Sequence, residues 1–119
     1  MPRIYAPVTP DDLETLRGGV SITAAQWFTA PAGLAGDALE EAEYDALIEA
    51  AAAASALVGE GRRRVVLAAD VDRATAGAPL AVGPKQVASL HVDETTEHSD
   101  DDLLWYDASE IADVIAATA

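Results

Sequence analysis

The hydrophobic pattern divides the chain into short apolar runs, which predict strands, and longer stretches with helical spacing. The clearest strand is 62–71, where the apolar residues from Val65 onward are nearly continuous. Such a run predicts a strand covered on both faces, in the centre of a sheet. Shorter strands are predicted at 3–8, at 20–30, late in 86–93 and at 103–106. Pro7 indicates a sheet edge or a strand end, because proline has no backbone N–H for a central ladder.

Three local signals predict helix starts. Thr9 can cap a first helix, and Pro10 suits its first position. The acidic residues at 37–40 and 107–110 both have capping-box spacing, which predicts one helix over about 37–58 and another from about Ser109. The first of these two has a small-residue apolar face.

Together these elements predict one α+β domain over residues 1–119. We expect a mixed sheet of about four to five strands with two or three packed helices. The segment 72–84, rich in Gly, Pro and Ala, is predicted to be a loop.

Composition excludes several classes of function. A net charge of −14 and a pI near 4.1 argue against nucleic acid and anionic membranes, which both need clustered basic residues. The chain has no cysteine, which excludes a disulfide framework and a thiolate zinc site. It begins without an apolar signal region. We therefore expect a cytoplasmic protein.

The acidic stretch 89–102 holds both histidines and has the strongest chemical character in the sequence. His91, Asp93, Glu94, Glu97, His98 and Asp100 are metal-ligand types, but their spacing matches no ordered motif. We therefore expect a solvated linker rather than a metal site, and no cofactor. His91 could also serve as a general base oriented by Asp93, although the sequence marks no nucleophile for it.

Two further sets of residues are candidates for ligand binding. Arg62 and Arg64 would bind a small anion or phosphate on one strand face, or would pair with the protein's own carboxylates. Asp70 and Asp72 lie at the far end of the central strand, where ligands bind in open sheets. They could equally form a turn.

The large aromatic residues are candidates for binding a partner. Trp27, Trp105 and Tyr106 could anchor a protein surface. Because aromatic residues make up only 5% of the chain, packing in the core is the favoured interpretation.

Three sequence blocks, at 62–71, 87–94 and 103–111, resemble those of a family of uncharacterised actinobacterial proteins. The resemblance extends in order to 4–9 and 41–55. It implies no activity, so no catalytic residue is carried over. It also implies a variable insert before the Leu-Leu-Trp-Tyr block, which is shortened here to 95–102. A required site is not expected in such an insert, which leaves His91 and Asp93 as candidates.

We therefore expect a non-catalytic protein that binds a protein partner or itself. The alternative is a small enzyme or ligand-binding protein that uses His91 and Asp93 together with Asp70 and Asp72.

Overall fold

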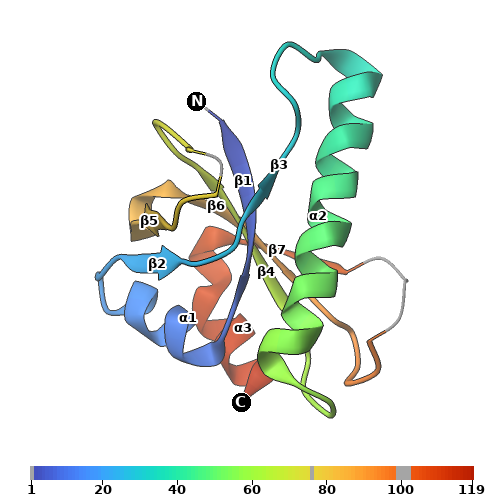
Figure 1. Ribbon diagram of the computed structural model, residues 1–119. Coiled ribbons are helices and arrows are strands. Elements are labelled where there is room, and N and C mark those ends of the chain that lie inside the picture. Colours follow the sequence, from blue (N-terminus) through green and yellow to red (C-terminus); the bar gives the residue numbers. More distant parts are fainter. Residues whose placement is uncertain (1, 76, 99–102) are drawn as a thin grey trace.

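A computed structural model describes residues 2–75, 77–98 and 103–119. One sheet separates two helical layers (Figure 1). Its strand order is β3-β1-β4-β6-β7. The strands are β1 (Arg3–Val8), β3 (Phe28–Thr29), β4 (Val65–Asp70), β6 (Val87–Val92) and β7 (Leu104–Asp107). A separate ribbon pairs β2 (Ile22–Ala24) with β5 (Leu80–Val82). The helices are α1 (Pro10–Arg17), α2 (Gly36–Val58) and α3 (Ile111–Thr118), with short 3-10 turns η1 (Pro84–Gln86) and η2 (Ala108–Glu110).

The α+β class and the five-stranded main sheet agree with the sequence prediction. The strand directions differ from the expected mixture, because every strand pair in the described ranges is antiparallel. A long connection, such as the one from β1 to β4, can return the chain to a sheet from either end. Element order alone therefore leaves strand direction open.

The central place of β4 is confirmed. β4 pairs with β1 on one side and β6 on the other, and Val65, Leu67 and Ala69 are fully buried. The prediction that Pro7 lies at a sheet edge holds on the β3 side of β1. Strand β3 pairs only with Ile4 and Tyr5. Pro7 lies beyond this pairing, so its missing backbone N–H removes no hydrogen bond to β3.

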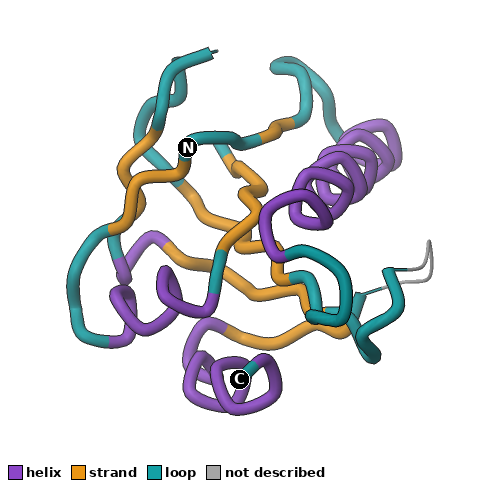
Figure 2. Tube along the Cα trace, turned by 60° about the horizontal axis from the view of Figure 1, so that its bottom comes forward, coloured by secondary structure: helices purple, strands orange, loops and turns teal. Residues whose placement is uncertain are grey.

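Different helices cover the two faces of the sheet (Figure 2), and each face has its own core. One face packs on α1, α3 and the β2–β5 ribbon, and its core is aliphatic. The other face packs on α2 through small side chains. This second core contains Tyr5, Val66, Ala68, Ala46, Ala50 and Ala51. Alanines let the helix lie close to the strands, because they present little volume between the two backbones.

All three predicted helices are found, and two of the three predicted caps are confirmed. The Thr9 hydroxyl accepts a hydrogen bond from the Asp12 N–H (3.1 Å), and the Asp12 carboxylate accepts one from the Thr9 N–H (3.0 Å). Asp107 and Glu110 form the same reciprocal cap at η2, which leads into α3. The capping box predicted at 37–40 is wrong. Helix α2 begins at Gly36, and its N-cap residue, Ala35, makes no side-chain hydrogen bond. None of the described helices is long and apolar enough to cross a membrane.

Two segments differ from their predicted conformation. The predicted strand 20–30 is divided into β2 and β3, which belong to different sheets, with a bend at Ala25 and Gln26 between them. The predicted loop 72–84 contains β5, which pairs with β2. Both differences come from long-range pairing, which local composition does not encode.

Candidate functional site

Helix α2 leaves part of its sheet face uncovered. It packs mainly on β1, β3 and β4, at one side of the sheet. On β6 and β7, Ser89 lies opposite Asp107, and His91 lies opposite Trp105. Ser89 and His91 also lie opposite Ala68 and Val66 of β4, which belong to the core under α2. Because directly opposed residues share a face, all four side chains lie on the α2 side of the sheet, beside the helix.

His91 is the centre of this region. Its Nε2 atom lies 3.0 Å from the Ser89 hydroxyl oxygen. Its ring centroid is 6.3 Å from that of Tyr5, with the rings inclined at 58°. Strand β4 runs between them, with Ala68 opposite Tyr5 and Val66 opposite His91. Burial lowers the pKa of His91, and the positive charge of Arg3 lowers it further.

We expect His91 to make the fold less stable in acid. Its pKa in the folded protein is lower than the ordinary value of 6.5, so the unfolded chain takes up a proton first as the pH falls. Stability is then lost as the pH falls through 6.5 toward the lower folded-state pKa. Urea unfolding at pH 7.5, 6.5 and 5.5 should show a smaller loss for His91→Gln than for the unaltered chain. Equal pH dependence in the two proteins would contradict the assignment to His91.

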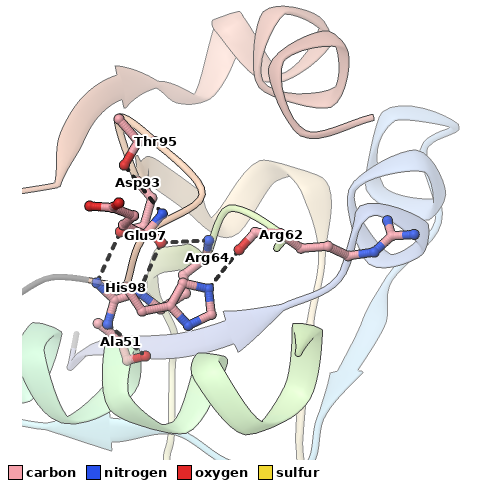
Figure 3. Close-up of polar contacts among 7 residues, drawn as sticks. All are labelled: Ala51, Arg62, Arg64, Asp93, Thr95, Glu97 and His98. Carbon is pink, nitrogen blue, oxygen red and sulfur yellow. Dashed lines mark hydrogen bonds and ion pairs between the residues drawn. The ribbon is translucent and has the colours of Figure 1, made fainter. Parts of the chain in front are cut away.

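Asp93 does not act with His91, because it forms a buried ion pair with Arg64 (Figure 3). Its Oδ2 accepts from the Arg64 backbone N–H at 2.7 Å and from Nε at 2.8 Å, and its Oδ1 accepts from Nη2 at 2.9 Å. The Arg64 Nη1 also donates to the Ala51 carbonyl of α2, at 3.4 Å. These contacts join β4, β6 and α2 at one corner of the sheet. The position of Asp93 is therefore that of a structural anchor.

Arg62 and Arg64 do not form the shared anion-binding face that the sequence predicts. Arg64 is buried against Asp93, whereas Arg62 is exposed. The backbone carbonyl of Arg62 accepts a hydrogen bond from Nε2 of His98 at 2.6 Å (Figure 3). His98 and Asp93 thus attach both described ends of the acidic loop 93–98 to the start of β4.

The candidate metal-binding side chains of the acidic stretch do not come together in the described ranges. Among residues 2–75, 77–98 and 103–119, no group of three or more His, Asp or Glu side chains is arranged to hold a metal ion. Asp100, another candidate acid, lies outside the described residues, as do Ser99, Asp101 and Asp102.

Asp70 and Asp72 separate in the structure. The Asp70 carboxylate accepts two hydrogen bonds from Arg3, one from Nε and one from Nη2, both at 3.0 Å. Hydrogen bonding to Arg3 holds the pKa of Asp70 below its ordinary value. Asp70 also lines a cavity of about 840 Å³. Asp72 is exposed in a bend beyond the strand.

The three aromatic candidates have different roles. Trp27 and Tyr106 pack against the aliphatic core, and the Trp27 indole N–H donates to the Ala78 carbonyl at 2.8 Å. Trp105 is 62% exposed. The packing interpretation therefore fits two of the three, and Trp105 is the exception.

Sequence reasoning missed Arg3, Tyr5 and Glu43, although each lies near a candidate residue. The alternation of Arg3 and Tyr5 on the first strand places both on the α2 face, which was the available signal. No sequence signal marked Glu43, because a glutamate on a long helix is ordinarily solvated.

The fold and these positions define a small α+β protein with an antiparallel sheet that α2 covers only in part. The chain belongs to the family of unknown function DUF6912, whose model matches residues 2–115. No curated protein and no solved structure matches the chain.

Proposed function

We propose that this chain is a non-catalytic interaction domain that binds a protein partner along strand β7. The observation that carries the proposal is Trp105, whose side chain is 62% exposed on a strand at the edge of the main sheet. An exposed edge strand offers backbone donors and acceptors to an added strand. Large exposed aromatic residues are frequent anchors at protein interfaces.

The two faces of β7 support strand addition. Trp105 lies on the α2 side of the sheet, opposite His91. Leu104, its neighbour in the chain, points to the other side and is 38% exposed. An added strand would bury apolar surface on both faces of the sheet while extending its ladder.

Charge selects the kind of partner. The chain carries a net charge of −14, so a second copy would approach with the same large negative charge. A basic protein would instead be attracted, and its association rate would fall as salt is raised. We therefore propose a basic partner, in the cytoplasm, where a chain without cysteine is at no disadvantage.

The competing enzyme hypothesis has weaker support. His91, Asp93 and Asp70 are each bonded to a different neighbour, namely Ser89, Arg64 and Arg3. Ser89 lies within hydrogen-bonding distance of His91, but it is only 6% exposed, and a nucleophile must be reached by its substrate. A binding function needs none of these groups to react.

Replacing Trp105 with serine is expected to weaken partner binding strongly and leave the fold intact. Loss of an interface anchor typically costs about 2 kcal/mol of binding free energy or more, or roughly a 30-fold loss of affinity. The immobilised chain would be used to capture proteins from native lysate at low and high salt. Hydrogen exchange of the β7 amides would then be measured in the recovered complex.

Val20→Ser is the matched control, because Val20 is 58% exposed in the loop after α1. The proposal predicts a basic partner that is retained by the control, released by salt and lost with Trp105→Ser. It also predicts protection of the β7 amides. A strict monomer that captures the same proteins with or without Trp105 would overturn it. A Trp105-dependent homodimer, detected by size-exclusion chromatography with light scattering, would overturn the choice of a basic partner.

A further inference from the structure

The cavity at the opposite edge of the sheet has the composition of a ligand site. It measures about 840 Å³, within the range of small-molecule pockets, and lies between the start of β1, the end of β4 and the first turns of α2. The segment 30–34 after β3 completes the wall. The lining residues that matter are Arg3, Trp27, Leu34, Leu39, Glu43 and Asp70.

The polar part of the cavity is already ordered. Arg3 is held by its two hydrogen bonds to Asp70. The Arg3 carbonyl accepts a hydrogen bond from the Thr29 hydroxyl of β3, at 2.7 Å. Trp27 is fixed by its bond to the Ala78 carbonyl. A ligand would therefore meet groups that need little rearrangement, which lowers the entropic cost of binding.

The charges of the cavity favour a cation. The described side chains that line it carry one positive charge, on Arg3, and two negative charges, on Asp70 and Glu43. Asp70 and Arg3 neutralise each other, so the carboxylate of Glu43 is in excess. The net charge of −14 adds a field that attracts cations and repels anions.

The apolar walls define the rest of the ligand. Trp27, Leu34 and Leu39 present an aromatic ring and two aliphatic side chains to the cavity. Leu34 is 38% exposed, and it would lose contact with water when the cavity is filled.

We propose that this cavity binds an organic cation on a short apolar stem, with its ammonium or guanidinium group at Glu43. The stem packs against Trp27, Leu34 and Leu39. This site is independent of the proposed interface at β7, because β3 and β7 are opposite edges of the sheet. The same chemistry is found in free amines and in the basic side chains of proteins.

The test is titration with 2-phenylethylamine, followed by the fluorescence of Trp27. It uses the Trp105→Phe variant, which leaves Trp27 as the one tryptophan of the chain. We expect a saturable change with the amine and none with 3-phenylpropionate, which carries the opposite charge. Glu43→Gln should weaken binding of the amine by about fivefold, as expected for loss of one partly exposed ionic partner. Glu41→Gln, an exposed position on the same helix, should leave it unchanged.

Equal responses to the amine and the carboxylate would overturn the proposal. The same holds for the absence of saturation up to millimolar amine, or for equal weakening by Glu41→Gln. Titration with the capped peptide acetyl-Gly-Lys-Gly-amide separates the two sources of ligand. Binding of the peptide as well as the amine assigns the cavity to a protein side chain, and binding of the amine alone assigns it to a free amine. Circular dichroism of each variant verifies that the fold is retained.

Discussion

Replacing Asp93 with alanine is expected to lower the free energy of unfolding by about 3–5 kcal/mol, the usual cost of leaving one member of a buried ion pair without its partner. The side chains of Arg64 and Asp93 are only 7% and 4% exposed, so water cannot replace the lost carboxylate. The substitution also removes the acceptor of the Arg64 backbone N–H. The measurement is urea-induced unfolding, followed by circular dichroism at constant pH.

Two further variants make this prediction specific. Asp72→Ala removes an exposed acid near the same strand and is expected to change stability by less than about 0.5 kcal/mol. Arg64→Met combined with Asp93→Asn removes both charges but keeps an amide oxygen for the Arg64 backbone N–H. This double variant should recover most of the loss, because burying two charges costs nearly as much as their attraction returns. A loss below about 1 kcal/mol for Asp93→Ala would contradict the role of the pair.

Replacing Leu67 with alanine is expected to cost about 2–5 kcal/mol of unfolding free energy. Leu67 is fully buried in the middle of β4, which has a neighbouring strand on each side. Truncation therefore leaves a cavity that a strand paired on both sides cannot readily close, in addition to the lost apolar burial.

Leu57→Ala is the control for this change, because it removes the same atoms from a side chain that is 49% exposed near the end of α2. Its expected effect is within about 0.5 kcal/mol. Similar losses for the two variants in the same denaturation experiment would show that β4 does not hold the core as described.

Strand pairing rather than composition decided which partners two of the candidate sets met in the structure. The hypothesis of ion pairing for the arginine run applies to Arg64, whose partner is Asp93. Asp70 met a basic residue, Arg3, from a strand more than sixty positions earlier in the chain. Neither partnership has a local signal, because each depends on the register between strands that are distant in sequence.

The candidate pair His91 and Asp93 shows the same limit. Alternation on a strand correctly predicts that residues two apart share a face. It does not predict which neighbours those residues meet. Asp93 lies just beyond the end of β6, where it reaches Arg64, while His91 meets Ser89 and Tyr5.

By itself, the sequence determined the α+β class, the central place of β4, the positions of the three helices and two of their caps. These features depend on short-range physics, namely the continuity of an apolar run and the reciprocal caps at Thr9 and Asp107. Only the tertiary structure decided the antiparallel pairing, the division of 20–30 between two sheets, and the buried pairing of Arg64 with Asp93. It also decided that Trp105 stays exposed while Trp27 packs. These outcomes depend on contacts between distant segments, whose energies arise only when the whole chain has found its register.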